Sequence, residues 1–435
     1  MGNYQGYQKY KDSGVEWLGD IPEHWEAIKG KFIFCILSGY APADFIFEDE
    51  GINYYQVDDL NDDSDIFLLR KSSKHIKQIN SSLILDAPFI LFPKRGAAIA
   101  TNKVKIVDKD SVFDTNLMGI KTNSKSCPKF ISYVILSRGL WDIADVSTVP
   151  QINNKHINPL FFPLPSLNEQ EKIAQFLDYK TKQIDELIKK KETLIEKLDE
   201  KRTALISHAV TKGLDSSVPM KDSGIEWLGE IPKHWKIIPI KRFSQIYDCK
   251  HKTVSFVDDG IPVASIAQVQ NFYIDLLIAK MTTKEEFIEM IEGGRKPQNG
   301  DIILSRNATV GASAIVQDDL FCMGQDVCLI RPVKANSVFL NYNFLAFFTK
   351  SQIDTCLLGS TFKRINVEEV KNLLICLPLL EEQKQIAQYL DQKTAQIDQQ
   401  KAKIKEAIEL LKEYRTSLIT NAVTGKIDVR QVAIP

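Results

Sequence analysis

The chain has 435 residues, and its 55 Lys and Arg against 56 Asp and Glu give a formal net charge of −1. This balance excludes a uniformly basic nucleic-acid binder, although opposed local patches can also add up to a neutral chain. The hydrophobic content of 44% and the charged content of 26% are ordinary for a globular protein. The longest apolar run, Leu373–Leu380, is much shorter than the ~20 residues that span a bilayer.

Charge and cysteines are both unevenly placed. Nine acidic and no basic residues lie between Asp44 and Asp65, whereas ten Lys or Arg and four Asp lie between Lys71 and Lys125. The second stretch can form a basic face or simply a solvated surface. The seven cysteines include no CxxC pair, which is typical of reduced thiols in a cytoplasmic protein. Cys249 and His251 alone are too few ligands for a metal, so we expect no metal site.

Two motifs occur twice in the chain. Residues 11–25 read KDSGVEWLGDIPEHW and residues 221–235 read KDSGIEWLGEIPKHW, with twelve of fifteen positions identical; we call each copy a box. Residues 164–178 read LPSLNEQEKIAQFLD and residues 377–391 read LPLLEEQKQIAQYLD, with ten positions identical. The order of box, insert and helix motif is therefore repeated, which predicts a tandem duplication.

Each box carries two tryptophans, Trp17 and Trp25 in the first copy, and its apolar residues follow neither a helical nor an alternating pattern. We expect an ordered loop in which both indoles are buried. The repeated histidine, His24 and His234, resembles a catalytic residue. No nucleophile or carboxylate cluster accompanies it in the sequence, so packing beside the tryptophan is the better interpretation.

The two inserts, residues 26–163 and 236–376, are predicted to be α+β domains, and apart from scattered matches their sequences differ. Strand-like runs and helical spacing alternate in both. Strands are predicted at 32–37, 52–57, 88–92 and 104–107 and at 261–269, 301–305 and 327–333, a hairpin at 301–316, and helices at 128–144 and 341–353.

Each helix motif opens a long amphipathic helix. Ser166 and Glu169 form a capping box after Pro165, and Gly213 suits the C-terminal end. Apolar residues then recur at three-four spacing over five heptads, which favours a coiled-coil seam. The predicted seam residues are Ile173, Leu177, Ile184, Leu187, Leu194, Leu198 and Leu205 in the first helix and Ile386, Leu390, Ile397, Ile404, Leu411 and Leu418 in the second.

An apolar stripe of this length needs a partner, and each helix has an equal one in the same chain. We therefore expect an antiparallel coiled coil with a pseudo-two-fold axis across it. The expected divisions are residues 1–163 (box and first insert domain), 164–213 (central spacer helix), 214–376 (box and second insert domain), 377–425 (C-terminal spacer helix) and 426–435 (tail).

The doubled KDSG(V/I)EWLG(D/E)IPxHW box and the helix entry ending in IAQ(F/Y)LD resemble the specificity (S) subunit of type I restriction–modification systems over the whole chain. The resemblance implies two target recognition domains that each read one half of a split DNA sequence. It implies two modification (M) subunits that carry S-adenosylmethionine and methylate adenine, and restriction (R) subunits that use ATP and Mg. No cofactor is expected in this chain.

Since the inserts differ and the helices set their spacing, we expect a bipartite, asymmetric DNA site. A helix over residues 168–212 would be about 67 Å long, which limits the gap to about 20 base pairs. The candidate contacts lie in loops and in the related segments STVPQIN (147–153) and STFKRIN (360–366), where a solvated residue is an equally good interpretation of any single one. They are Lys94, Arg95, Lys103 and Lys105 in the first domain and Ser305, Arg306, Asn307, Lys363 and Arg364 in the second.

Two alternatives are a stand-alone DNA methyltransferase and a coiled-coil scaffold that binds only proteins. A methyltransferase that flips adenine needs a (D/N)PP(Y/F) motif, and Asn158-Pro159-Leu160-Phe161 lacks the second proline. The sequence also has no GxGxxG or GxxxxGK(S/T) loop, so we expect no catalytic residue. The target bases depend on loop geometry and DNA deformation and are not predicted.

Overall fold

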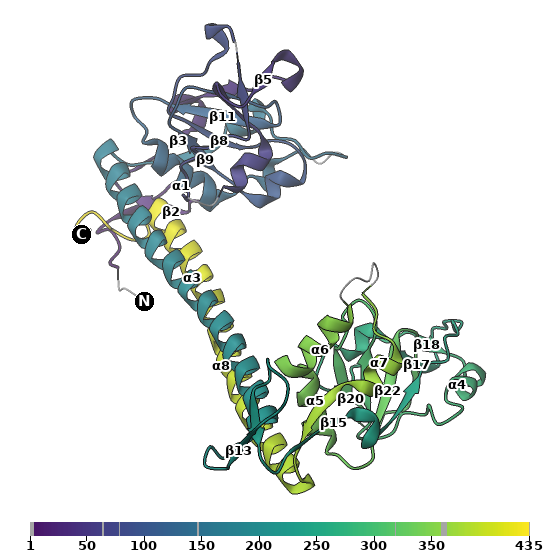
Figure 1. Cartoon of the computed structure of the whole chain (residues 1–435). Coiled ribbons are helices and arrows are strands. Elements are labelled where there is room, and N and C mark those ends of the chain that lie inside the picture. The colour runs from purple at the N-terminus through teal and green to yellow at the C-terminus, as the bar shows by residue number, and fades with distance from the viewer. Residues whose placement is uncertain are drawn as a thin grey trace. The chain divides into compact units, whose positions relative to one another are not determined.

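The computed structural model describes residues 4–62, 65–77, 79–145, 148–317, 319–357 and 363–434. The chain forms two compact units, residues 1–190 with 406–435 (unit 1) and residues 191–405 (unit 2). Each unit contains one box, one insert and a part of each long helix, so the units cut across the expected divisions (Figure 1). Among the described residues no helix is long and apolar enough to cross a membrane.

The described residues of unit 1 form two four-stranded sheets, two short strand pairs and, ahead of the long helix, two α-helices and several 3-10 helices. The larger sheet has the order β4-β11-β8-β9 and the smaller one the order β10-β6-β7-β5. The larger sheet consists of β4 (Phe34–Ser38), β11 (Leu117–Thr122), β8 (Phe89–Pro93) and β9 (Lys105–Val107), and the smaller of β10 (Val112–Phe113), β6 (Ile52–Tyr55), β7 (Lys74–Ile76) and β5 (Phe47–Glu48). The remaining elements are β1 (Tyr10–Asp12), β2 (Asp20–Pro22), β3 (Glu26–Lys29), β12 (Phe161–Leu164), α1 (Pro128–Arg138), α2 (Asn154–Ile157) and the long α3 (Leu167–Lys212).

Unit 2 repeats this plan with a four-stranded sheet, β16-β22-β19-β20, and a three-stranded sheet, β18-β17-β21. These strands are β16 (Ser244–Asp248), β22 (Val327–Pro332), β19 (Ile302–Ser305), β20 (Ser313–Ile315), β18 (Met281–Thr282), β17 (Ile261–Ala264) and β21 (Cys322–Met323). The remaining elements are β13 (Met220–Asp222), β14 (Glu230–Pro232), β15 (Lys236–Pro239), β23 (Leu374–Leu377), α4 (Lys284–Met290), α5 (Ser337–Leu345), α6 (Phe347–Leu357), α7 (Val367–Asn372) and the long α8 (Leu380–Val423).

The α+β fold predicted for both inserts is confirmed, and most predicted strands are present. The run 261–269 is wrong in its second half, because Ser265 and Gln268 form a capping box that starts a 3-10 helix at Ile266–Val269. The single helix predicted at 341–353 is instead two helices, α5 and α6, which meet at Ala346.

The box is a β-hairpin and not a loop. Strands β1 and β2 pair antiparallel in unit 1, and β13 and β14 do so in unit 2. Only the second tryptophan of each box, Trp25 and Trp235, is buried. Trp17 is half-buried and Trp227 is exposed, so the expectation of two buried indoles is wrong for the first of each pair.

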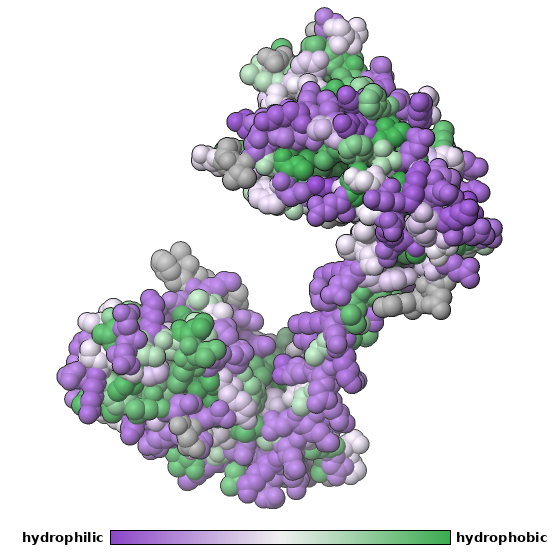
Figure 2. All heavy atoms as spheres, turned by 180° about the vertical axis from the view of Figure 1, so that it is seen from behind, coloured by the Kyte–Doolittle hydropathy of each residue, from purple (hydrophilic) through white to green (hydrophobic). Residues whose placement is uncertain are grey.

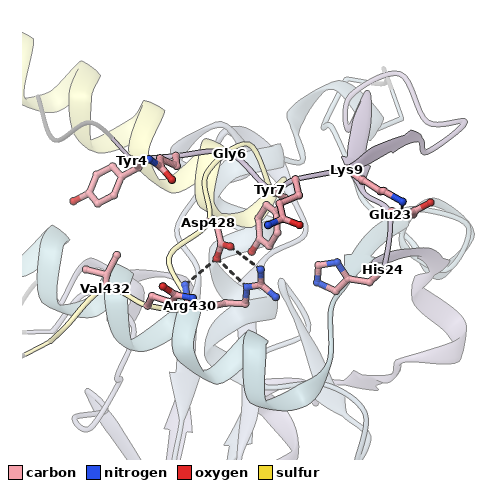
Figure 3. Close-up of a pocket in the computed structure, with 12 residues that line it drawn as sticks. Tyr4, Gly6, Tyr7, Lys9, Glu23, His24, Asp428, Arg430 and Val432 are labelled. Atoms are coloured by element: carbon pink, nitrogen blue, oxygen red, sulfur yellow. Dashed lines mark hydrogen bonds and ion pairs between the residues drawn. The ribbon is translucent and has the colours of Figure 1, made fainter.

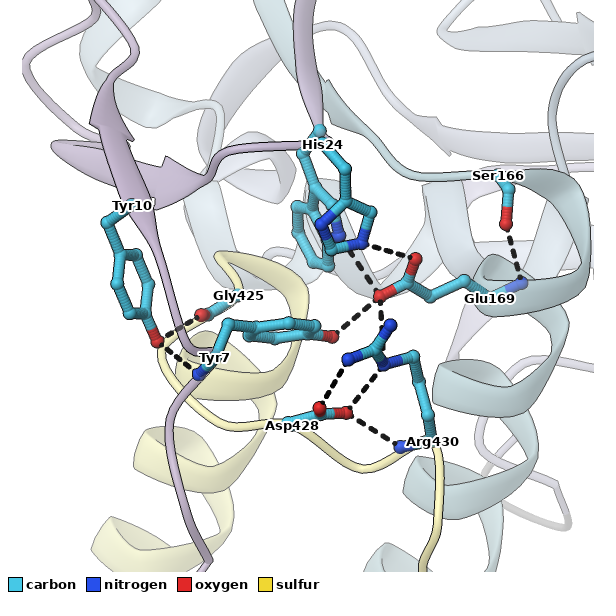
Figure 4. A network of polar contacts seen from close by, with 9 residues as sticks. Tyr7, Tyr10, His24, Ser166, Glu169, Gly425, Asp428 and Arg430 are labelled. Atoms are coloured by element: carbon cyan, nitrogen blue, oxygen red, sulfur yellow. Dashed lines mark hydrogen bonds and ion pairs between the residues drawn. The ribbon is translucent and has the colours of Figure 1, made fainter.

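Each buried indole binds a carboxylate at the start of a long helix. Trp25 Nε1 donates to Glu169 Oε1 at 3.1 Å, and His24 Nε2 lies 3.0 Å from Glu169 Oε2 (Figure 4). In unit 2, Trp235 and His234 contact the Glu382 carboxylate at 3.0 and 2.9 Å. The repeated histidine therefore has a carboxylate partner that the sequence did not indicate, and both belong to a packing contact between box and helix.

Three further repeated residues fix each long helix to its domain. The Gln170 side chain accepts from the Cys127 N–H and donates to the carbonyl oxygens of Lys125 and Pro165. Gln383 accepts from the N–H of Asn336 and donates to the carbonyl of Pro378. About two to three turns further along each long helix, Asp178 accepts from the Tyr133 hydroxyl with Thr181 nearby, and Asp391 accepts from Tyr342 with Thr394 nearby. Burial beside these carboxylates raises the pKa of both tyrosines.

The termini complete the same contact in unit 1. The Tyr7 hydroxyl donates to Glu169 Oε1 at 2.8 Å, and Arg430 Nε lies 3.9 Å from that atom while its guanidinium pairs with Asp428. A pocket of about 760 Å³ lies over this junction, with Tyr4, Tyr7, His24, Asp428 and Arg430 in its wall (Figure 3). Residues 426–432, predicted only as a tail, are thus part of the packed structure, since Asp428 N also donates to Gln5 O.

The two long helices run antiparallel within each unit. In unit 1 Arg415 pairs with Asp185, and in unit 2 Arg202 pairs with Asp398 and Lys401 with Asp199. The two residue numbers add up to 600 in every pair, so both units use one register. The predicted antiparallel pairing is confirmed in each unit.

The predicted seam is wrong at two positions. Leu187 and Leu194 are 43% and 48% exposed, and the half-buried residues there are Ile188 and Ile195. Leu205 is half-buried beside the buried Ile206. A straight helix of 3.6 residues per turn drifts by about 20° per heptad from a strict seven-residue repeat, so the buried face moves onto the following residue.

This corrected seam predicts unequal effects of two Leu→Ala substitutions. Leu177→Ala removes a fully buried side chain and should lower the free energy of unfolding by about 2–5 kcal/mol. Leu187→Ala should change it by less than about 0.5 kcal/mol. Urea unfolding of the purified chain measures both, and equal losses would contradict the seam.

The two helix-start carboxylates predict a second difference. Glu169 is 5% exposed, accepts from Tyr7 and lies 3.9 Å from Arg430, whereas Glu382 is 28% exposed, so water can replace part of its contacts. Glu169→Ala should therefore cost about 2 kcal/mol or more, and Glu382→Ala about half as much. Thermal unfolding followed by circular dichroism compares the pair; a larger loss for Glu382→Ala is the opposite of what burial predicts.

Candidate DNA-recognition surfaces

In each unit the loop after a central strand of the larger sheet meets the segment that closes the insert. In unit 1 the Lys94 N–H donates to Asn116 O, and Lys94 O accepts from Ile152 N–H. In unit 2 the Arg306 N–H donates to Asp326 O, and Arg306 O accepts from Ile365 N–H. Lys94 and Arg306 therefore occupy equivalent positions, and the structure brings together the predicted loops and closing segments.

A further main-chain bridge follows one residue later in each loop. Arg95 is bridged to Gln151, and Asn307 is bridged to Arg364. Arg95, Lys363 and Arg364 are exposed, with Arg364 3.7 Å from Asp326. These positions can reach a ligand outside the protein, and they carry different side chains in the two units. Ser147 and residues 360–362 of the closing segments, and Asp63 and Ser64 of the acidic run, lie outside the described residues.

The equivalent cations Lys94 and Arg306 differ in their surroundings. Lys94 is half-buried, and burial lowers the pKa of its ammonium although the carboxylate of Asp114 acts in the opposite direction. Arg306 is buried, with its guanidinium 2.8 Å from Asp248 Oδ1. The prediction of Arg306 as a DNA contact is therefore not supported by its position, because its charge is already paired inside the domain.

Two other predicted contacts are inside the protein. The buried Lys105 ammonium donates to the carbonyl oxygens of Asp62 and Asp65, and the buried Ser305 hydroxyl donates to Asn307 O. Their side chains stabilise the loops instead of facing solvent, a distinction that residue type alone does not make. Lys103 and Asn307 are half-buried.

Gln151 is the residue of these surfaces that sequence reasoning missed. Its signal was positional: it lies 213 residues before Arg364, the same offset that relates the two helix motifs. It carries no charge, so basic character does not single it out, yet an amide can bind adenine through two hydrogen bonds.

A cluster of possible metal ligands lies beside Arg306. The ligand atoms of Asp248, Cys249 and His251 lie within 4.8 Å of one another, so the structure adds a carboxylate to the two residues seen in the sequence. The Arg306 guanidinium is also 3.9 Å from Cys249 Sγ. Because this buried cation already neutralises the carboxylate, we assign no metal to the cluster.

Comparison with known proteins connects these paired domains to a family. A family model described as the type I restriction modification DNA specificity domain matches residues 22–197 and again residues 232–410. The chain belongs to this family. Its two matched regions each contain one insert and most of a long helix, which agrees with the tandem repeat of the fold.

Relatives within the family match either nearly the whole chain or about half of it. The type I restriction enzyme MjaVIII specificity subunit of Methanocaldococcus jannaschii is 25% identical, with 95% of each chain covered. The EcoKI specificity subunit of Escherichia coli is 27% identical over 46% of this chain and 44% of its own. Specificity subunits of type I systems are non-catalytic components that work in complexes with other subunits and DNA.

Solved structures share the fold. A chain from a study of complex assembly and conformational transition of the type I R-M system has a TM-score of 0.73 at 16% identity, covering 93% of this chain and 98% of that one. The HsdS subunit from Thermoanaerobacter tengcongensis has a TM-score of 0.57 at 17% identity, covering 94% and 98%.

Replacing the buried Lys105 should lower stability, whereas replacing the exposed Lys363 should not. Lys105→Ala leaves two carbonyl oxygens of part-buried hydrogen bonds without their donor and should cost about 1 kcal/mol or more. Lys363→Ala, at an exposed position, should change the free energy of unfolding by less than about 0.5 kcal/mol. Chemical unfolding of both variants tests this, and a neutral Lys105→Ala would return Lys105 to the candidate contacts.

Proposed function

We propose that this chain is the DNA-specificity subunit of a type I restriction–modification complex and that it reads a bipartite, asymmetric DNA site. One observation carries this proposal: the two units dock their long helices through the same repeated residues but expose different side chains at equivalent loop positions. Arg95 with Gln151 in unit 1 corresponds to Asn307 with Arg364 in unit 2. Two equal scaffolds with unlike surfaces suit two unlike half-sites.

The partners follow from the family relationship and the repeat. We infer two modification subunits, one for each copy of the repeated scaffold, which would supply S-adenosylmethionine and the adenine methyltransferase activity. Restriction subunits would supply ATP- and Mg-dependent cleavage. We also place the complex in the cytoplasm, which suits the seven free cysteines. In this proposal the chain chooses the site and its partners carry out the chemistry.

The family relationship and the two unlike surfaces favour DNA reading over the alternative of a protein-only scaffold. A scaffold would need no exposed cations at the loop bridges. A reader of duplex DNA needs Lys and Arg that fix its position on the phosphates and side chains that distinguish bases. Arg95, Lys363 and Arg364 suit the first role, while Gln151 and Asn307 suit the second.

The double substitution Lys363→Ala with Arg364→Ala tests this proposal in the assembled complex. If both residues bind phosphates, affinity should fall for every DNA sequence, and the slope of log K against log salt should flatten by about 2. Fluorescence anisotropy with labelled duplex at several salt concentrations measures this. Lys284→Ala, on the exposed face of α4, is the matched control.

Two further results would decide the proposal as a whole. Methylation mapping of DNA from cells that contain the complex should give one split motif with a constant gap, and the motif should vanish when this chain is omitted. Persistence of the motif without this chain would show that another component selects the site.

A further inference from the structure

The smaller sheets of the two units contain the same lysine–phenylalanine pair, although their sequences differ. In unit 1 the Lys74 ammonium lies 5.3 Å from the centre of the Phe47 ring. In unit 2 the Lys280 ammonium lies 4.7 Å from the Phe256 ring. The first pair joins the neighbouring strands β5 and β7, and the second lies just before β18, beside the isolated bridge between Val257 and Met281. Both distances are within the range of a cation–π contact.

Strand register shows that these pairs are equivalent. In unit 1, Ile76 is opposite both Ile52 and Phe47. In unit 2, Thr282 is opposite Ile261, and the bridge between Val257 and Met281 places Phe256 beside Thr282. Lys74 and Lys280 each come two residues before this central position.

The glycines before β6 and β17 support this equivalence independently. A Cβ on Gly51 would lie 2.3 Å from the carbonyl oxygen of Ile76, and a Cβ on Gly260 would lie 2.3 Å from that of Thr282. No side chain fits at that distance, so both sheets need glycine at the same place. The two sheets are therefore built alike around their lysine.

The residues just before each lysine are exposed and differ sharply in chemistry. Three residues before Lys74 is Lys71, preceded by Arg70, and both are exposed. Three residues before Lys280 is Leu277, followed by Ile278, and these are 91% and 77% exposed. Neither Arg70 nor Lys71 pairs with a carboxylate among the residues that the structure describes. The segment that leads to the lysine thus carries exposed cations in unit 1 and exposed aliphatic side chains in unit 2, with Lys71 and Leu277 at the same position.

In both units the smaller sheet, or the segment that follows its strand β17, lies next to the loop that carries Lys94 or Asn307. In unit 1 the Tyr54 hydroxyl of β6 lies 3.3 Å from Asp114 Oδ2, the carboxylate that acts on Lys94. In unit 2 Gln270 Nε2 donates to Thr309 Oγ1 of the Asn307 loop at 2.9 Å, and Gln268 O accepts from Asp275 N, two residues before Leu277. Apolar residues lie exposed on both units (Figure 2).

We propose that this sheet is a second DNA-reading element in each unit: Lys74 and Lys280 bind a phosphate, while Arg70–Lys71 and Leu277–Ile278 contact bases. Arg and Lys match the acceptors of guanine, and aliphatic groups match the methyl group of thymine. The inference rests on the proposed function and adds specificity-determining residues to it.

Sequence divergence favours DNA over a protein partner as the ligand. A partner that binds both halves of the chain alike would dock on the repeated boxes and helices, where most positions are identical. The proposed contacts lie in the inserts, where only the framework is shared and the exposed residues change. Exposed acidic residues precede the glycine in both units, Asp258 and Asp259 in unit 2 and Asp49 and Glu50 in unit 1, so a phosphate contact depends on the lysine itself and not on a net positive surface.

The test uses the assembled complex, two double variants and methylation mapping. Leu277→Ser with Ile278→Ser should weaken binding to the mapped site about tenfold and relax one half of the split motif. Arg70→Ala with Lys71→Ala should relax the other half. Ile288→Ser, an exposed aliphatic of α4, and Lys109→Ala are the matched controls and should change neither affinity nor motif.

Each other outcome overturns the inference without touching the proposed function, provided that the wild-type complex gives a split motif. Variants that keep the wild-type motif and affinity would show that the sheet does not read DNA. Variants that fold but no longer join the other subunits would make the surface a protein interface. If both double variants relaxed the same half of the motif, the two sheets could not each read a separate half-site, and the inference would be wrong. Absence of any split motif with the wild-type complex would instead refute the proposed function.

Discussion

A carboxylate at the start of each long helix, buried at Glu169 and half-buried at Glu382, is the interaction on which the rest of the fold depends. Glu169 and Glu382 lie at equivalent places and accept a hydrogen bond from the indole of their own box. A carboxylate removed from water is tolerated only when donors surround it, so it fixes box and helix in one geometry. The next residue, Gln170 or Gln383, then binds the residue that caps a domain helix, α1 or α5. Two consecutive side chains thus join box, domain and long helix.

Antiparallel pairing makes each unit depend on distant parts of the chain. The last turns of α8 supply Leu418, Ile419, Ala422 and Val423 to the core of unit 1, while the last turns of α3 supply Ile206, Ala209 and Val210 to that of unit 2. In unit 2 the chain runs directly from α3 into its box. In unit 1 the corresponding connection is made without a covalent bond, by Tyr7, Asp428 and Arg430. Lys212 and Lys426 have the same role in the two units. Lys212 binds the carbonyl oxygens of Leu228 and Glu230, and Lys426 binds that of Asp20, so each holds its own box hairpin. Lys212 precedes the glycine at its helix end, whereas Lys426 follows it.

The repeat, the α+β inserts and the paired helices could be predicted because they are local or periodic properties. Identical boxes and three-four spacing are visible without any contact being known. What the sequence could not supply is the direction of single side chains. Lys105 and Lys363 are both lysines in predicted contact segments, yet one ammonium lies among carbonyls and the other faces solvent. Arg306 was misplaced for the same reason, because its partner Asp248 lies 58 residues earlier in the chain. The predicted seam was wrong only at Leu187 and Leu194, because the buried face of a straight helix drifts away from a strict seven-residue repeat.

These errors have a common cause that bears on how such a protein can change its specificity. Several residues repeated between the halves point inward: Trp25, Glu169, Gln170, Asp178 and their counterparts all form contacts between elements. Residues that differ between the halves include those in the loops next to the sheets, such as Arg95 and its counterpart Asn307, or Lys71 and its counterpart Leu277. Because an exposed residue contributes little to the free energy of unfolding, its identity can change without loss of the fold. A surface of this kind is free to diverge in one domain while the other domain and the helix docking stay as they are, and each half-site can then vary independently.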